Sequence, residues 1–351
     1  MSIRHPIPGW LFCLANVLAF LSVALAEPVS DSSIVSDKVI AHIDDGDFVH
    51  PAFSPDGKRL AYVKVAMADQ TELAEVYLRE LASGATWRLL DAKTARKYAV
   101  YKAFIYRLQW VSNDRLVASV SDGDVGTTLV EFDVAARRIV SERGDEDAEA
   151  AWYAEIESRM RSVSALPEWK PAIVQNAFEN GVALQDGSFL IQPLYAGVSP
   201  DVFHITRQGR LTQLTRLAKD AFNALCGGLQ VNDSLLFLLA ESRTGNSRKA
   251  DLLRYHNGQI EKLDSIATLT EPRLEPLHVG RTRALFFVAT GYTYQRSPGA
   301  LYEYASGELR RWPSSNALHS VTVDAAGRML SLVMWRKGRR IIEVREIGHR
   351  D

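Results

Sequence analysis

Short apolar and β-branched runs alternate with turn residues along most of the chain. The clearest example covers residues 50–62, which read HPAFSPDGKRLAY. Pro55 fixes φ at the turn, Asp56 can hydrogen-bond its own backbone, and Gly57 accepts a positive φ. The apolar run 59–65 follows, and residues 74–80 and 86–90 flank the turn Ser83-Gly84. This pattern predicts a unit of four short antiparallel strands.

The same unit recurs five more times. Each copy has a turn signal such as Asp-Gly or Asn-Asp followed by two or three strand-like runs. The copies fall at residues 106–142, 185–215, 232–263, 280–312 and 319–347. A period of about 40 to 50 residues with four strands is typical of one β-propeller blade.

The two ends of the repeat region predict how the ring closes. The sixth copy has only three strands, and the strand-like run 34–43 precedes the first copy without a unit of its own. If that N-terminal strand completes the last blade, no blade keeps a vacant outer edge. We therefore expect an all-β fold, a six-bladed β-propeller of four-stranded antiparallel blades over residues 27–351.

One stretch departs from the strand pattern. Residues 142–168 are rich in Glu, Asp, Arg and Ala, and Trp152, Ile156, Met160 and Val163 recur at helical spacing. They predict a helical insertion between blades two and three. The apolar stripe of such a helix packs against the propeller or docks a partner, and the first interpretation is the simpler.

The residues 50–62 carry a family resemblance. The segment closely resembles the repeat of TolB-like propellers, and equally that of the propeller domain of the prolyl oligopeptidase and dipeptidyl-peptidase family. Later blades keep only the turn and the strand spacing. The resemblance implies the propeller fold; the α/β domain that precedes the TolB propeller has no counterpart between Glu27 and the first strand-like run.

The first 26 residues predict a secretory signal peptide. Arg4 precedes an apolar run from Trp10 to Leu25, which ends in the small-residue site Ala24-Leu25-Ala26. We expect removal of this segment, no membrane span afterwards, and a periplasmic or secreted location. The single remaining cysteine, Cys226, excludes an internal disulfide.

Charge and composition exclude several classes of protein. The chain has 351 residues, of which 47% are hydrophobic and 24% charged, as in ordinary globular proteins. Its 41 basic and 42 acidic residues nearly balance, so nothing indicates a nucleic-acid partner. The basic run 336–340 fits a solvated hairpin turn around Gly338.

Catalytic motifs are missing from the sequence. There is no G-x-S-x-G pentapeptide, no βαβ series after the propeller, and no H-E-x-x-H spacing. The triad of the resembled peptidases belongs to a hydrolase domain, so the resemblance transfers no catalytic residue. We expect no enzyme activity, no cofactor and no metal.

Aligning the blades on their turns gives a candidate ligand site at the mouth of the central channel. Six polar or reactive residues occupy equivalent positions on the innermost strands: His50, Arg107, Asn180, Cys226, Glu275 and Ser320. Arg107 would repel a metal cation but can hold a carboxylate, and Glu275 can hold an amine. A peptide terminus or small polar ligand therefore fits better than a metal. The alternative is a solvated rim of ordinary turn residues.

Aromatic residues give a second candidate surface for a partner. Exposed Tyr beside Arg is common in protein interfaces, although packing between blades explains such residues equally simply. The candidates lie in the connection into blade two and in a loop of blade five: Tyr98, Tyr101, Tyr292, Tyr294 and Arg296.

Three functions remain open from the sequence. The first is a non-catalytic propeller that binds an envelope protein, a peptide or a small polar ligand. The second is the propeller of a prolyl oligopeptidase-like serine peptidase, with its hydrolase encoded separately or lost. The third is a metal-dependent lyase centred on the channel, whose ligands would come from different blades.

Overall fold

The computed structural model describes most of the predicted propeller. The described residues are 35–68, 71–98, 104–121, 127–144, 181–192, 201–217, 223–241, 248–268, 272–290, 299–312 and 318–347. The predicted signal peptide, residues 1–26, therefore lies outside them. Within the described part no helix has the length and apolar character needed to cross a membrane.

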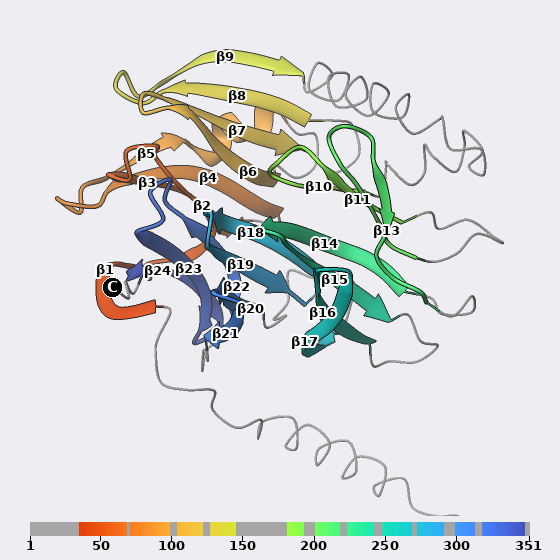
Figure 1. The fold of residues 1–351 in the computed structure, drawn as a ribbon. Coiled ribbons are helices and arrows are strands. Elements are labelled where there is room, and N and C mark those ends of the chain that lie inside the picture. The colour runs from red at the N-terminus through yellow and green to blue at the C-terminus, as the bar shows by residue number, and fades with distance from the viewer. Residues whose placement is uncertain are drawn as a thin grey trace, which may run out of the picture. The chain divides into compact units, whose positions relative to one another are not determined.

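The described chain forms six separate four-stranded antiparallel sheets (Figure 1). In blades one to five the four strands follow each other in sequence order. Blade one contains β2 (Asp47–Phe53), β3 (Arg59–Ala68), β4 (Thr71–Glu80) and β5 (Thr86–Leu90). Blade two contains β6 (Phe104–Ser112), β7 (Arg115–Ser121), β8 (Thr127–Asp133) and β9 (Arg138–Gly144). Six such sheets form the six-bladed β-propeller that the sequence predicts.

Blades three to five repeat the arrangement. Blade three contains β10 (Val182–Ala183), β11 (Phe189–Ile191), β12 (Phe203–Ile205) and β13 (Leu211–Gln213). Blade four contains β14 (Asn223–Val231), β15 (Ser234–Glu241), β16 (Arg248–His256) and β17 (Gln259–Thr268). Blade five contains β18 (Arg273–Val279), β19 (Arg283–Ala289), β20 (Ala300–Ala305) and β21 (Glu308–Trp312).

Blade six joins the two ends of the chain. It contains β22 (Leu318–Val323), β23 (Met329–Arg336) and β24 (Arg339–Ile347), and its fourth strand is β1 (Val35–Ile43). The pairing of β1 with β24 runs antiparallel from Val35 opposite Ile347 to Ile43 opposite Ile342. The predicted closure by an N-terminal strand is thus confirmed.

Apolar side chains fill the spaces between neighbouring blades. Leu78 of blade one and Phe132 of blade two, for example, are fully buried in one cluster. Similar clusters join blades three to four, four to five, five to six and six to one. Burying one such large side chain contributes about 1.5 to 3 kcal/mol. The blades therefore stabilise one another.

A β-bulge interrupts each of the five long innermost strands. In β2 Val49 pairs with Val63 and Ala52 with Ala61, which leaves two residues opposite one. Equivalent breaks in register occur in β6, β14, β18 and β22. A bulge bends the strand and redirects its side chains. The bulges therefore decide which side chains gather near the channel that the innermost strands of a propeller surround.

One bulge depends on a glycine at a close approach between blades. Gly227 of β14 has φ of 123°, and a Cβ placed there would lie 2.6 Å from the carbonyl oxygen of Leu274 on β18. No side chain fits between the two innermost strands at this point.

The structure differs from the sequence expectation in two places. Residues 142–144 extend β9 because Arg143 and Gly144 pair with Leu129 and Thr128 of β8, so the predicted helical insertion does not begin at residue 142. The rest of that insertion, residues 145–168, lies outside the described residues. A short helix α2 (Ala92–Ala95) and a 3-10 turn η2 (Arg96–Tyr98) after blade one were not predicted.

Candidate functional site

The predicted channel-mouth residues that the structure describes all lie on innermost strands. His50 is on β2, Arg107 on β6, Cys226 on β14, Glu275 on β18 and Ser320 on β22. Asn180 lies outside the described residues. Placement on the innermost strands agrees with the expectation, but the bulges change which of these side chains meet.

The bulges shift the equivalence between blades by one or two residues. His50 and Cys226 lie inside their bulges, whereas Arg107 and Ser320 come directly after theirs. The bulge of β22 falls between Leu318 and Ser320, so its extra residue is His319. His319 thus lies inside the bulge of β22, as His50 lies inside the bulge of β2.

His50 and His319 belong to a polar seam between blades six and one, which we define as Asp47, His50, His319 and Arg340. Strand β2 packs against both β22 and β24, so the four residues meet where the ring closes. Arg340 donates from Nε to Oδ1 of Asp47 at 2.7 Å and from Nη2 to Oδ2 at 2.5 Å. The backbone N–H of Arg340 also donates to Oδ1, at 2.9 Å. This carboxylate thus accepts two hydrogen bonds from the guanidinium, which are strong because both groups are charged, and a third from the backbone of Arg340.

The two imidazoles of the seam are held in the neutral state. Burial lowers the pKa of His50 to about 4, and the charges of His319 and Arg340 act in the same direction. Burial also lowers the pKa of His319 to about 4, with a further contribution from Arg340 that Asp47 opposes. Desolvation disfavours the charged form of a base, and the nearby guanidinium adds repulsion. At neutral pH the seam carries one ion pair and two uncharged rings.

His50 also has an uncommon backbone conformation. Its φ is 51°, in the left-handed region that residues other than glycine rarely occupy. Strain of this kind costs about 1 to 3 kcal/mol and persists only where the surroundings impose it. Here the bulge of β2 imposes it, and the following Pro51 donates no hydrogen bond to the ladder.

The remaining predicted residues do not join the seam. Arg107 is exposed, and Sγ of Cys226 donates to the carbonyl of Ala224 at 3.3 Å. Glu275 is accessible to solvent, yet surrounding protein raises its pKa, against the opposing effect of Arg273. Partial desolvation of the carboxyl disfavours its charged form and so raises its pKa. Oγ of Ser320 is buried without a hydrogen-bond partner among the described residues.

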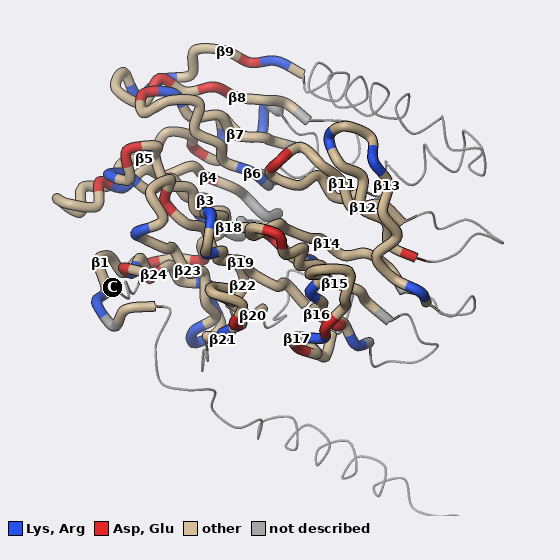
Figure 2. The backbone as a smooth tube through the Cα atoms, in the orientation of Figure 1, with Lys and Arg blue, Asp and Glu red and all other residues tan. Residues whose placement is uncertain are grey.

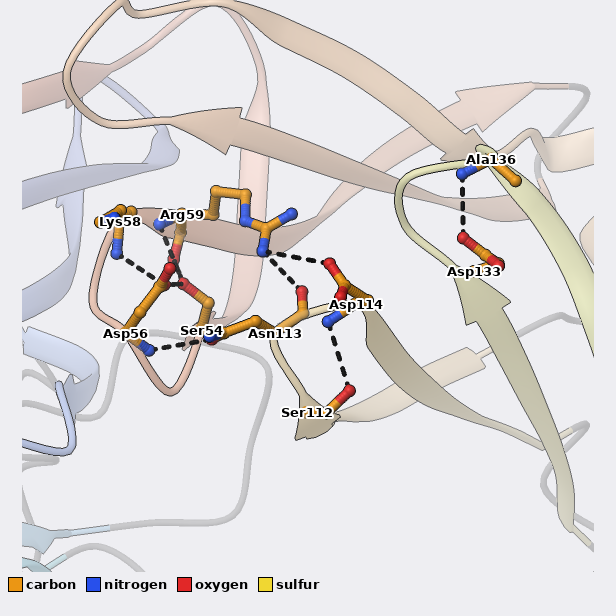
Figure 3. A network of polar contacts seen from close by, with 9 residues as sticks. All are labelled: Ser54, Asp56, Lys58, Arg59, Ser112, Asn113, Asp114, Asp133 and Ala136. Carbon is orange, nitrogen blue, oxygen red and sulfur yellow. Dashed lines mark hydrogen bonds and ion pairs between the residues drawn. The ribbon is translucent and has the colours of Figure 1, made fainter.

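A second polar network links blades one and two at the turn of residues 54–58 (Figure 3). Ser54 donates to Oδ1 of Asp56 at 2.6 Å, and Asp56 N–H donates to Oδ1 of Asn113 at 3.0 Å. Arg59 donates to the carbonyl of Asn113 at 2.6 Å and lies 5.4 Å from the ring centre of Trp110. This motif, which carries the family resemblance, fastens one blade to the next.

Two Ser–His contacts resemble catalytic pairs only by composition. Oγ of Ser188 lies 2.9 Å from Nε2 of His204 and 2.6 Å from Oδ1 of Asp186, so the serine proton goes to the carboxylate. Oγ of Ser234 lies 3.3 Å from Nδ1 of His256. Both serines are buried. A nucleophile needs access to substrate and a base that takes its proton, and neither pair offers both.

In the described part of the chain, no three His, Cys, Asp or Glu side chains lie together in a group that could hold a metal ion. Acidic and basic residues are mixed along the same strands and turns (Figure 2). Of the predicted partner surface, Tyr98 ends η2, and Tyr101, Tyr292, Tyr294 and Arg296 lie outside the described residues.

Sequence comparison gives no relatives: no protein-family model and no curated protein matches the chain. Among solved structures, the β-propeller domain of the Trilobed protease from Pyrococcus furiosus aligns over 86% of this chain and 82% of its own, with 13% identity and a TM-score of 0.31. A prolyl endopeptidase aligns over 87% of this chain and 40% of its own, with 14% identity and a TM-score of 0.29. TolB from Acinetobacter baumannii aligns over 77% and 58%, with 16% identity and a TM-score of 0.27.

The strand order of the described residues establishes the six-bladed propeller that the sequence predicts. The chain spans less than two thirds of the prolyl endopeptidase and TolB chains. Nothing about activity follows from the alignments.

Proposed function

We propose that the protein is a non-catalytic propeller of the bacterial envelope that binds a protein, peptide or small polar ligand at its channel mouth. One observation carries the proposal: the innermost strands present accessible side chains of opposite charge, Arg107 on β6 and Glu275 on β18. Charged groups of both signs are what a zwitterionic or polar ligand requires. The sequence has no catalytic motif that would add a reactive group beside Arg107 and Glu275.

Capture from periplasmic extract tests the proposal. The purified protein and the variant Arg107→Ala with Glu275→Ala are compared, and each captured protein is purified and titrated back against both. We expect saturable binding by the unchanged protein, weakened at least about tenfold in the variant, since each lost charged contact is worth about 1.5 to 3 kcal/mol.

A matched control changes two exposed charges on outermost strands, Lys262→Ala on β17 with Glu308→Ala on β21. This control should bind like the unchanged protein. Equal binding by the channel variant would contradict the channel mouth as the site. A separately encoded serine hydrolase among the captured proteins would favour the peptidase interpretation.

A further inference from the structure

The hairpin between β23 and β24 carries three positive charges in four residues. Residues 336–339 read Arg-Lys-Gly-Arg, and all four are exposed. Lys337 and Gly338 have φ of 49° and 84°, which is the backbone of a tight two-residue turn. We call residues 336–339 the basic tip. It joins the second and third strands of blade six, so it is separate from the innermost strands that carry the proposed channel-mouth site.

Strand pairing places like charges opposite each other in the basic tip. Arg336 is the register partner of Arg339, with Lys337 in the turn between them. Like charges directly opposite each other on two strands are destabilising. Asn-Gly or Asp-Gly would form the same turn without any added positive charge. A local arrangement that costs stability without a structural gain is expected mainly at functional sites.

Neighbouring carboxylates neutralise only part of this charge. Glu343 lies 3.4 Å from Arg336, but it lies closer to Arg345, at 2.7 Å. Asp47 pairs with Arg340, the residue that follows the basic tip, and so leaves the tip unchanged. One buried carboxylate is therefore shared between two guanidinium groups.

The other two cations of the basic tip have no acidic partner in the described part of the chain. Among the ion pairs of the described residues, only the one between Arg336 and Glu343 involves the tip. The acidic residues between β1 and β2, Asp44 and Asp45, pair with side chains of β1 and β3. Lys337 and Arg339 thus remain as exposed positive charges.

The surroundings of the basic tip decide which kind of partner fits. A Cβ added at Gly338 would meet no atom within 4 Å, so the turn projects into open space. The nearby apolar residues Met334 and Ile341 are buried and offer no anchor. A protein interface depends on such anchors, and a small ligand needs a concave site. A projecting group of cations without either feature fits an extended anionic surface.

We propose that the basic tip holds the protein at the surface of an anionic phospholipid bilayer by contacts with the phosphates of the headgroups. The guanidinium groups of Arg336 and Arg339 can each hold a phosphate through two hydrogen bonds, and Lys337 adds a point charge between them. The inference goes beyond the proposed function, because it concerns the surface that holds the propeller and not the ligand of its channel mouth.

Vesicle co-sedimentation tests the proposal. The purified protein is mixed with vesicles of phosphatidylcholine alone, or of phosphatidylcholine with phosphatidylglycerol, at low salt and at about 0.15 M salt. Binding to the neutral vesicles measures any apolar contribution, including that of residues 10–25, and is subtracted. We expect the excess binding to anionic vesicles to fall as salt is raised, because ions screen exposed charges beyond about 8 Å at the higher concentration.

A variant of the basic tip tests the residues themselves. Lys337→Asn with Arg339→Gln removes the two unpaired charges, and asparagine accepts the positive φ of position 337. We expect the partition coefficient for anionic vesicles to fall about 25-fold, since each basic residue near such a surface contributes a factor of about five. Circular dichroism verifies that the variant is folded.

The matched control is Arg207→Gln with Arg210→Gln. It removes the same charge from two exposed residues at the turn between β12 and β13. That turn joins the third and fourth strands of its blade, whereas the basic tip joins the second and third, so the two turns lie at opposite ends of a blade. The control should bind the vesicles like the unchanged protein.

Three outcomes would each overturn the proposal: equal binding to neutral and anionic vesicles, undiminished binding by the basic-tip variant, or an equal loss in the control. Partner capture with the basic-tip variant separates a lipid from a protein. Loss of a captured acidic protein, without excess binding to anionic vesicles, would assign the tip to a protein partner instead.

The two proposals fail separately. The channel variant Arg107→Ala with Glu275→Ala should bind anionic vesicles like the unchanged protein, and the basic-tip variant should still bind the channel ligand. Vesicle binding that depends on the basic tip, without any captured partner, removes only the channel-mouth site. Capture that depends on the channel residues, without excess binding to anionic vesicles, removes only the lipid contact.

Discussion

Arg340 shows at the scale of single residues how much the seam depends on one carboxylate. Its side chain is 5% exposed, and Asp47 supplies its charge partner. We expect Asp47→Ala to destabilise the protein by about 3 to 5 kcal/mol, since the change leaves a buried guanidinium unpaired. Urea unfolding at pH 7.5 measures the effect.

A surface pair provides the comparison for that substitution. Lys38 and Glu346 lie 2.6 Å apart but are 66% and 42% exposed. Glu346→Gln should cost less than about 1 kcal/mol because solvent screens the pair. Similar losses in the two variants would mean that the Asp47–Arg340 pair is no stronger than an exposed one.

The two neutral histidines predict how stability depends on pH. Both have a pKa of about 4 in the folded protein against 6.5 for an unperturbed ring. Between these values the unfolded chain binds more protons, so stability falls as pH is lowered from 6.5 towards 4 and is constant above 6.5 with respect to these groups. A single ring with this shift contributes on the order of 3 kcal/mol.

Urea titrations at pH 7.5, 6, 5 and 4 check this dependence against the double variant His50→Gln with His319→Gln. The variant should lose less stability on acidification than the unchanged protein, because its carboxylates are the same and only the two imidazoles are missing. Parallel pH curves would show that these histidines do not resist protonation in the folded state.

At the scale of strands, much of the fold follows from the sequence and the rest depends on pairing between blades. Turn residues such as Pro55, Asp56 and Gly57 locate strand ends, and β5 has the predicted bounds, Thr86–Leu90. In blade three the strands are shorter than the apolar runs of the sequence from which they form. The reason is that β11 pairs with β12, and β12 with β13, over only three residues. The strand propensity of two apolar runs does not show over how many residues they pair with each other.

The bulges explain why the candidate site was predicted only in part. Alignment on turns assumes that each bulge lies at a constant distance before its turn. The bulge of β2 includes His50, four residues before Ser54, whereas that of β22 is His319, five residues before Asp324. The alignment therefore selected Ser320 and missed His319. Pro51, Gly227 and Pro276 are signals that the strands are interrupted, because proline and glycine in a strand mark bulges.

Gly227 predicts how tightly the innermost strands of blades four and five approach. We expect Gly227→Ala to cost about 2 to 5 kcal/mol, since φ of 123° is strained for alanine and its Cβ would overlap the backbone of β18. Thermal and urea unfolding both report the loss.

Gly258 separates the cost of the strained φ from the cost of the overlap with a neighbouring strand. Its φ is 79°, but a Cβ there meets nothing within 4 Å, so Gly258→Ala should cost only the conformational part, about 1 to 2 kcal/mol. If both substitutions cost the same, the close contact between β14 and β18 contributes nothing beyond backbone strain.

At the scale of the whole molecule, the pairing of β1 with β24 holds the ring closed. Ala41 lies opposite Val344 in the register of the two strands. A disulfide in Ala41→Cys with Val344→Cys would span nearly the entire chain, and we expect it to stabilise the oxidised protein by about 2 to 4 kcal/mol. The measurement compares unfolding midpoints of the variant with and without reductant.

The reduced variant is its own control for the loss of apolar side chains, and Cys226 is left in place in both forms. A disulfide that forms without raising the midpoint would mean that β1 separates from β24 too rarely, or too late in unfolding, to limit stability.

The same pairing sets the order of events when the protein is made. Residues 35–43 leave the ribosome before the other strands of the propeller, and their partner is complete only at residue 347, the last residue of β24. At about 5 to 20 residues per second, the first strand waits on the order of tens of seconds for its only neighbour. Throughout that time it is an unpaired edge, the part of the nascent chain most open to a chaperone or to another copy of itself.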